Sequence, residues 1–384
     1  MMPVFIREAL RTARGKARPD GGLAAETPHG LVAALVGALA ERAANPGESE
    51  ALLLGCVGQT GAQGGNIAQV AKLAAGLPDK VAAQSLNAYC ASGLIAVGQA
   101  AAMIETGALT GALAGGVEMM SRVPFMADDA TYYTDTSFAP PARYIPVALA
   151  ADRLATRQTI GRAALDEVAL RSQAASTAAE EDARLIRSRI DAGGLSRDEC
   201  IRPDLDLARL QALPPAFEPL RSAYAEALGD EPFDLQHSIA HAPPMCDGAG
   251  LAMLSSSPQG ARARILSYAQ AGGSVDDSLL AGFAAMEQAL DRAGLTLDQM
   301  DAIEFMEAFA VVIAKFMRDY AVNPARVNMA GGHLAKGHPM GATGAILLST
   351  LLDCLDAREG RYGLVVVTGA AGIGAAMVVE RIAA

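Results

Sequence analysis

The strongest constraint on the fold is an order of elements that occurs once at each end of the 384-residue chain. In each copy, apolar residues recur first with the period of a strand and then with that of a helix. The shared order is strand, helix, strand, helix, helix, strand. Such alternation predicts parallel sheets covered by helices, so we expect an α/β protein built from two duplicated halves.

The two copies differ in detail. The expected elements of the first are, in order, a strand at 4–12, a helix at 28–44, a strand at 51–57, a helix at 66–75, a helix after Cys90 and a strand at 108–120. Those of the second are a strand at 265–273, a helix at 277–292, a strand at 302–309, a helix, a glycine-rich segment, a helix at 345–355 and two strands around a glycine turn within 364–382.

A stretch of different composition separates the copies. It holds many charged residues, with a charged helix expected at 166–186 and a loop at 201–220. An insertion of this kind is either a loop domain that recognises substrate or a solvated helical segment without a ligand role. The predicted parts are an N-terminal half (1–120 with 237–262), an inserted loop domain (121–236) and a C-terminal half (263–384).

Composition narrows the possible partners. The formal net charge of -11 argues against nucleic acid or an anionic membrane as the main partner. The five cysteines are widely spaced and form no CxxC pair, which predicts no metal site and no disulfide framework and favours a reducing cytoplasm. The N-terminus lacks the apolar core of a signal peptide, and no apolar run is expected to be long and clean enough to cross a bilayer.

The segment LNAYCASGLIAV places Cys90 just before an apolar helical pattern. Most isolated cysteines are inert core residues. Two features favour a nucleophile instead. A helix N-terminus lowers a thiol pKa and favours the thiolate, and the small residues that follow leave room for a substrate.

The segment GGHLAKGHPMGATGA holds His333 and His338, two of the five histidines. Its glycines indicate a tight loop, and Pro339 restrains the backbone beside His338. A histidine held on such a loop suits a base that activates a thiol or a donor to an oxyanion. The alternative is a turn histidine that caps a helix.

Two further segments carry weaker signals. The turn TGAAGIGAA, which starts at Thr368, has small residues whose N–H groups could line an oxyanion pocket, but it could also be a simple hairpin. Glu307 is an acid within the apolar run FMEAFA. A buried carboxylate that anchors backbone N–H groups explains it better than a catalytic one.

Taken together and in this order, these segments resemble the thiolase family over essentially the whole chain. The most specific are CASG at Cys90, GGVEMMSRVPF at Gly115, MEAFA at Met306, GHPMGATG at Gly337 and GAAGIG at Gly369. The resemblance implies two α/β halves with five-stranded mixed sheets, in helix-sheet-helix-sheet-helix layers with an inserted loop domain. It also implies a homodimer, or a dimer of dimers.

The resemblance implies an acyltransferase that uses coenzyme A thioesters as substrates and holds no permanently bound cofactor. Cys90 would take the acyl group and His338 would activate it. The backbone N–H groups of Cys90 and Ala370 would hold the oxyanion. Phe309, Pro243 and Gly341 fall in segments implied to bind substrate.

The chain departs from the family pattern at four of these positions. Thr368 stands where the family has a second cysteine, and a hydroxyl is a far weaker acid and base than a thiol near pH 7. Ala370 replaces a glycine, Met306 an asparagine that positions a water, and Pro243 a serine that contacts coenzyme A. A fifth difference is His333, which stands where the family usually has a small residue; it is either a substitute base or donor, or it fills space.

The acylation residues are therefore present, whereas those for carbon–carbon chemistry are altered. The sequence favours a thiolase-type acyltransferase that acts through a cysteine acyl-enzyme. One alternative is a hydrolase, or a carbon–carbon lyase or condensing enzyme, on the same fold. Another is a non-catalytic subunit that binds acyl-CoA.

Overall fold

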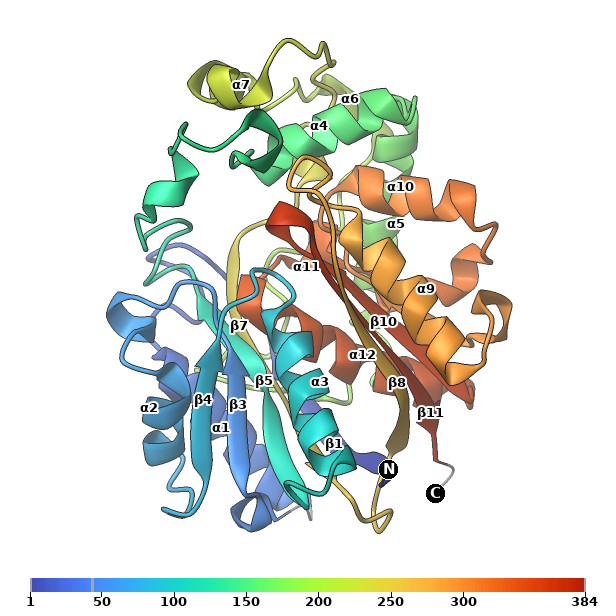
Figure 1. Cartoon of the computed structure of the whole chain (residues 1–384). Helices are drawn as coiled ribbons and strands as arrows, with labels where there is room; N and C mark the ends of the chain where they lie inside the picture. The colour runs from blue at the N-terminus through green and yellow to red at the C-terminus, as the bar shows by residue number, and fades with distance from the viewer. Residues whose placement is uncertain (1, 43–44, 383–384) are drawn as a thin grey trace.

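The computed structural model of the chain describes residues 2–42 and 45–382. Its main strands form one mixed sheet in the order β4-β3-β5-β7-β1-β8-β11-β10-β9 (Figure 1). The strands are β1 (Val4–Thr12), β2 (Gly15–Lys16), β3 (Ala51–Gly55), β4 (Ala82–Leu86), β5 (Gly111–Met119), β6 (Arg189–Ile190), β7 (Cys246–Ser255), β8 (Ala263–Gly272), β9 (Ala302–Phe305), β10 (Tyr362–Thr368) and β11 (Ile373–Arg381).

Twelve α-helices accompany these strands in the described residues. They are α1 (Pro28–Glu41), α2 (Ile67–Ala74), α3 (Ser92–Glu105), α4 (Val147–Arg157), α5 (Arg162–Ala179), α6 (Leu207–Ala212), α7 (Glu218–Ala223), α8 (Ala225–Leu228), α9 (Ala281–Ala293), α10 (Ala310–Asp319), α11 (His333–Lys336) and α12 (Thr343–Arg358).

The expected duplication is visible in the strand order. In the first half, β3 pairs in parallel with β4 and β5, and β7 and β1 follow with antiparallel pairing. In the second half, β9 and β10 are parallel, and β11 and β8 follow antiparallel. The halves join edge to edge where β1 pairs antiparallel with β8, with Val4 opposite Ile265.

The second half has one strand fewer than the resemblance implies. Its outermost segment makes only a single bridge, between Val327 and Ile303. A 3-10 turn at Pro324–Arg326 occupies this place, and proline cannot donate a ladder hydrogen bond. The first half has all five strands. β4 was not expected because its sequence AAQSL has weak strand signals.

The helices lie in layers around the strands. α3 and α12 pack on each other, and both contact strands of the two halves, so they form a central layer. α1 and α2 cover the outer face of the first half, while α9 covers that of the second (Figure 1). The duplicated α/β fold is thus confirmed. The residue limits given for its three parts stay a prediction.

One helix of the described residues, Met340–Arg358 including a short 3-10 start, is long and apolar enough to cross a membrane by composition. The sequence-based expectation did not anticipate it. However, 89% of its most apolar window is buried inside the protein. It is the central core helix α12, and its all-round apolar sequence follows from contact with both halves.

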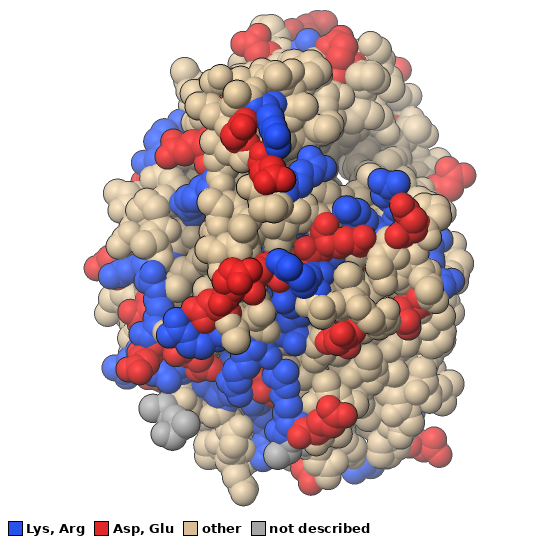
Figure 2. All heavy atoms as spheres, turned by 180° about the vertical axis from the view of Figure 1, so that it is seen from behind, with Lys and Arg blue, Asp and Glu red and all other residues tan. Residues whose placement is uncertain are grey.

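The inserted segment contains more helix than expected. α6 and the start of α7 lie within the expected loop, and Asp206 caps α6 by accepting a hydrogen bond from the N–H of Arg209. Conversely, the charged helix ends at Ala179 rather than near 186. The acidic residues Glu180, Glu181 and Asp182 follow, where the negative end of the helix dipole disfavours them. Seen from behind, the surface carries basic and acidic side chains next to one another (Figure 2).

Candidate active site

Cys90 lies in a tight turn that leads into α3. The preceding Tyr89 has a φ of 48°, a left-handed conformation that is unusual for a bulky residue. Ser92 holds the turn, because its hydroxyl accepts a hydrogen bond from the N–H of Ala88 at 2.8 Å and donates one to the carbonyl of Tyr89 at 2.5 Å. A strained, firmly held turn at a nucleophile position is typical of functional sites.

His338 lies on the turn between α11 and α12, and its ring contacts Cys90. The Nε2 atom lies 3.1 Å from the Cys90 Sγ atom, although the two residues are 248 positions apart. The other ring nitrogen, Nδ1, lies 2.6 Å from the hydroxyl oxygen of Thr343, the first residue of α12. When Nδ1 carries the proton and donates it to Thr343, Nε2 is free to accept the thiol proton.

Two glycines allow this approach. A Cβ atom on Gly93 in α3 would lie 2.7 Å from the carbonyl oxygen of Gly341, and one on Gly344 in α12 would lie 2.4 Å from Leu94. Any side chain at either position would push the two central helices apart. The distance between the thiol and the imidazole therefore depends on the backbone contact between α3 and the start of α12.

The electrostatics favour a neutral pair at rest. Burial raises the pKa of the Cys90 thiol to about 12, although the backbone N–H groups of Ala370 and Cys90 point at the sulfur and act in the opposite direction. Burial, with a smaller effect of the Arg14 guanidinium, lowers the pKa of His338 to about 3. The expected lowering of the thiol pKa by the helix N-terminus is thus outweighed by burial.

Two buried charged residues brace the site across the halves. Glu118 accepts hydrogen bonds from the N–H groups of Val57 at 2.9 Å and of Gly341 at 3.0 Å, which ties the end of β5 to the turn that carries His338. Arg14 donates to the carbonyl of Gly337, adjacent to His338, at 2.8 Å. Arg14 is only 2% exposed, and no carboxylate of the described residues lies within ion-pair distance of it.

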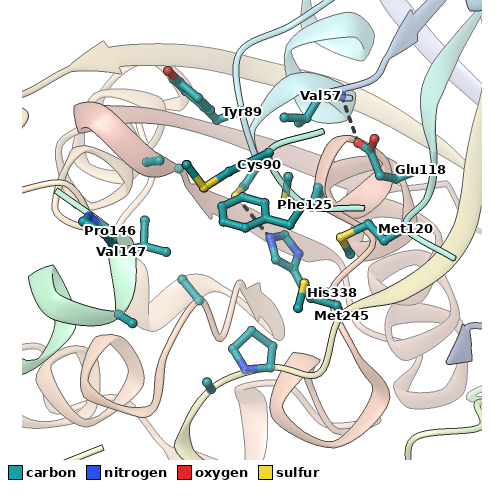
Figure 3. A pocket seen from close by; sticks show the side chains of 18 of the residues that line it. Val57, Tyr89, Cys90, Glu118, Met120, Phe125, Pro146, Val147, Met245 and His338 are labelled. Atoms are coloured by element: carbon teal, nitrogen blue, oxygen red, sulfur yellow. Dashed lines mark hydrogen bonds between the residues drawn. The ribbon is translucent and has the colours of Figure 1, made fainter. Parts of the chain in front are cut away.

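Cys90 and His338 line a pocket of about 290 Å³ between the two halves and the inserted segment (Figure 3). In Figure 3, Phe125 lies in front of the Cys90–His338 pair and Met120 lies to one side of it. Five other residues singled out from the sequence also line the pocket, namely Pro243, Met306, Phe309, Thr368 and Ala370.

Thr368 has the most informative surroundings of these five residues. It ends β10 and is fully buried, and its hydroxyl oxygen has no hydrogen-bond partner among the described residues. Met306 also lines the pocket, and its thioether cannot donate a hydrogen bond. Thr368 therefore lines the same pocket as Cys90, but its unpartnered hydroxyl oxygen is itself buried.

Three other residues singled out from the sequence lie outside the pocket lining. His333 is fully buried behind His338, with ring centroids 5.5 Å apart, and neither of its ring nitrogens has a partner among the described residues. Burial lowers its pKa well below the usual value, so it stays neutral. Gly341 faces Glu118 and Gly93 rather than the pocket, which disagrees with the expected substrate contact.

The contacts of Glu307 are those of a structural residue that anchors neighbouring segments. Its carboxylate accepts hydrogen bonds from the Ser172 hydroxyl at 2.6 Å, the Asn328 amide at 3.1 Å and the N–H of Leu334 at 2.9 Å. It is 2% exposed and does not line the pocket. These contacts agree with the structural interpretation favoured from the sequence.

Sequence reasoning missed Thr343, Arg14 and Glu118. Thr343 had a usable signal, a hydroxyl residue five positions after His338 where a helix begins. Glu118 lies in a segment noted for its resemblance, without an assigned role. In the part of the chain that the structure describes, no three His, Cys, Asp or Glu side chains are grouped as metal ligands would be.

The families and proteins that this chain resembles agree with a site built from Cys90 and His338. The family described as "Thiolase, N-terminal domain" matches residues 4–225, and "Thiolase, C-terminal domain" matches residues 259–381. The chain belongs to the thiolase family. It is a thiolase-type acyltransferase.

Individual thiolases match along their whole length. A "Beta-ketoadipyl-CoA thiolase" of Pseudomonas aeruginosa is 34% identical, with 99% of each chain covered. A "3-ketoacyl-CoA thiolase" of Vibrio vulnificus is also 34% identical, over 99% of this chain and 100% of the relative. A crystal structure of the Bacillus anthracis acetyl-CoA acetyltransferase superposes with a TM-score of 0.86 at 27% identity, covering 100% of this chain and 99% of that one.

Proposed function

We propose that this thiolase cleaves or transfers the acyl group of 3-ketoacyl-CoA and acyl-CoA thioesters through a covalent acyl group on Cys90. The observation that carries the proposal is the 3.1 Å contact between the Cys90 Sγ atom and His338 Nε2 inside a pocket with a mostly apolar lining. The names of the relatives support coenzyme A thioesters as the substrate class.

Proton transfer follows from the neutral resting pair. The sulfur attacks the thioester carbon of an acyl-CoA or the 3-keto carbon of a 3-ketoacyl-CoA, and as it does so the thiol proton passes to His338 Nε2. The Nδ1–H group stays bonded to Thr343, which keeps the ring in the tautomer that accepts this proton. The proton then passes from Nε2 to the leaving thiolate, or to the leaving carbanion when a 3-ketoacyl thioester is cleaved.

The negative charge that forms on the carbonyl oxygen needs donors. The N–H groups of Cys90 and Ala370 already point at the sulfur, so an oxygen on a carbon bonded to that sulfur lies within their reach. Pre-oriented donors in a desolvated pocket are worth several kcal/mol, about 3 for one donor in comparable sites. Ala370 keeps this donor although it carries a side chain.

Two acceptors can take the acyl group from Cys90. A coenzyme A thiol is the first candidate. Water is the second, because Thr368 does not supply the second thiol of the family pattern beside the pocket. Thr368 cannot replace a thiol as a base at neutral pH, so carbon–carbon bond formation is expected to be slow.

We further propose a homodimer in a reducing cytoplasm. β4 is an edge strand of the sheet, so one side of its backbone is open to pairing with another chain. All five cysteines are free, as is usual where disulfides are not formed. The alternative is a dimer of dimers, and the molecular mass of the protein in solution distinguishes it from a homodimer.

Intact-protein mass spectrometry tests the proposal. The protein is mixed with acetyl-CoA or acetoacetyl-CoA, with Cys90→Ala as the control. We expect an acetyl adduct on the parent protein and none on the variant. Adding coenzyme A should remove the adduct faster than buffer alone, whereas equal rates would favour the hydrolase. Full acyl transfer by Cys90→Ala would refute the role of Cys90.

A further inference from the structure

The pocket around Cys90 has an unusual lining for this chain. The chain has nine phenylalanines and eight tyrosines, and six of these aromatic residues line this one cavity. They are Tyr89, Phe125, Tyr133, Tyr144, Phe217 and Phe309. No Lys or Arg of the described residues lines it. The pocket therefore offers apolar faces and no positive charge to pair with an anionic group.

The two ends of the pocket differ in exposure. Phe125 is 42% exposed and Met245 is 57% exposed, so the pocket opens where they lie. Tyr144 is 4% exposed and Leu279 is 3% exposed, so these residues lie at its closed end. Coenzyme A is large and polar, and a cavity of about 290 Å³ cannot enclose it. Its chain must enter through the open end, and the acyl group then extends towards the closed end.

The closed end is an aromatic wall. The Tyr133 and Tyr144 rings lie 5.0 Å apart, and behind them lies a second cavity of about 260 Å³ that both residues also line. The Tyr133 hydroxyl donates a 3.0 Å hydrogen bond to Asp128, a carboxylate that lines the acyl pocket. Asp128 is exposed, but no cationic side chain of the lining offsets its charge, so a carboxylate at the end of an acyl group would meet a like charge and no counter-ion.

We propose that this pocket selects thioesters with an uncharged, apolar acyl group, and that the Tyr133–Tyr144 pair limits the length of that group. The inference rests on the proposed function and adds its substrate class. An apolar cavity of about 150 Å³ is enough to hold benzene. The acyl end of this pocket therefore fits a medium chain or a single ring, and the wall stops a longer chain.

The test compares single-turnover acylation of Cys90 by four coenzyme A thioesters, namely acetoacetyl, 3-ketooctanoyl, 3-ketotetradecanoyl and 3-ketoadipyl. We expect 3-ketooctanoyl-CoA to react fastest. The dicarboxylic thioester should react about 100-fold more slowly, because its charge is buried without a partner. Equal or faster reaction of 3-ketoadipyl-CoA would overturn the proposal.

Variants at the wall test the length limit. Tyr144→Ala should join the two cavities and raise the relative rate with 3-ketotetradecanoyl-CoA at least about tenfold, while Tyr144→Phe should keep the parent preference. Tyr224→Ala is the matched control, because Tyr224 lines the second cavity and packs on Tyr144 with ring centroids 6.1 Å apart, but does not line the acyl pocket. If Tyr144→Ala does not fold, the half-buried Tyr133 is replaced by alanine instead.

The outcomes separate this inference from the function on which it rests. Acylation by every thioester at similar rates, or an unchanged preference in a folded wall variant, refutes the length limit and leaves the acyl-enzyme intact. No Cys90 adduct with any of the four thioesters refutes the proposed function, and the inference falls with it.

Discussion

Replacing Thr343 with valine should slow acyl-enzyme formation without weakening substrate binding. The Thr343 hydroxyl oxygen lies 2.6 Å from His338 Nδ1, is fully buried and does not line the pocket. Valine keeps the shape of threonine and removes only the hydrogen-bonding atom. The His338 ring then loses the contact that fixes its tautomer, and Nδ1–H is left buried without a partner.

The size of the effect follows from that loss. A buried donor left without a partner costs about 1–3 kcal/mol. Part of the neutral histidine population also moves to the tautomer that places the proton on Nε2, which cannot accept the thiol proton. Together these changes predict a fall in the acylation rate of about 10- to 100-fold, since about 1.4 kcal/mol corresponds to a factor of ten.

The acylation reaction is quenched at set times, and intact-protein mass spectrometry then gives the rate at which the acyl-enzyme forms. KM is determined in parallel. Thr350→Val is the matched control, because Thr350 is also buried in α12 but bonds only to the Ile346 carbonyl, at 3.0 Å. Thr343→Ser should retain most of the rate. A rate for Thr343→Val within about twofold of that for Thr350→Val would refute the orienting role, since a lost tautomer contact should cost at least a factor of ten.

Three further predictions concern packing, acid stability and the missing thiol. Gly93→Ala should lower the free energy of unfolding by about 1–3 kcal/mol in urea titrations, whereas Gly37→Ala, with open space around its Cβ position, should raise it by about 0.5–1 kcal/mol; equal effects would contradict the close helix contact. The pKa of His338 is lowered to about 3, first by burial, so between about pH 6.5 and 3 the unfolded chain binds a proton that the native chain does not. Stability is therefore full above pH 6.5 and falls on acidification by up to about 1.4 kcal/mol per pH unit from this residue, and His338→Gln should reduce that slope. Thr368→Cys supplies a thiol in place of an unpartnered hydroxyl and should raise the rate of acetoacetyl-CoA formation from acetyl-CoA; an unchanged rate would show that the missing cysteine does not limit the reaction.

Local patterns in the sequence predicted much of the fold. The strand at β1, the helix that follows Cys90 and the two strands around the turn after Thr368 were each predicted from periodicity and glycine positions. The errors fall where such signals are weak or misleading. The short β4 and α6 were missed, and the apolar sequence of α12 was not recognised as a possible span, because burial on all sides is set by neighbours in space.

The sequence by itself determined the duplicated α/β plan and the family, and it predicted Cys90 and His338 as the catalytic pair, because each depends on short-range patterns or compact motifs. Only the tertiary structure decided which groups surround that pair. It placed Thr343 behind the imidazole and His333 outside the pocket, and it reversed the expected direction of the thiol pKa. The thiol pKa and the pocket lining depend on burial and on contacts such as that between Cys90 and His338 across 248 positions, which no local pattern encodes. Thr343 and His333 each lie five positions from His338, but which side of the imidazole they occupy is set by the packing of the surrounding helices.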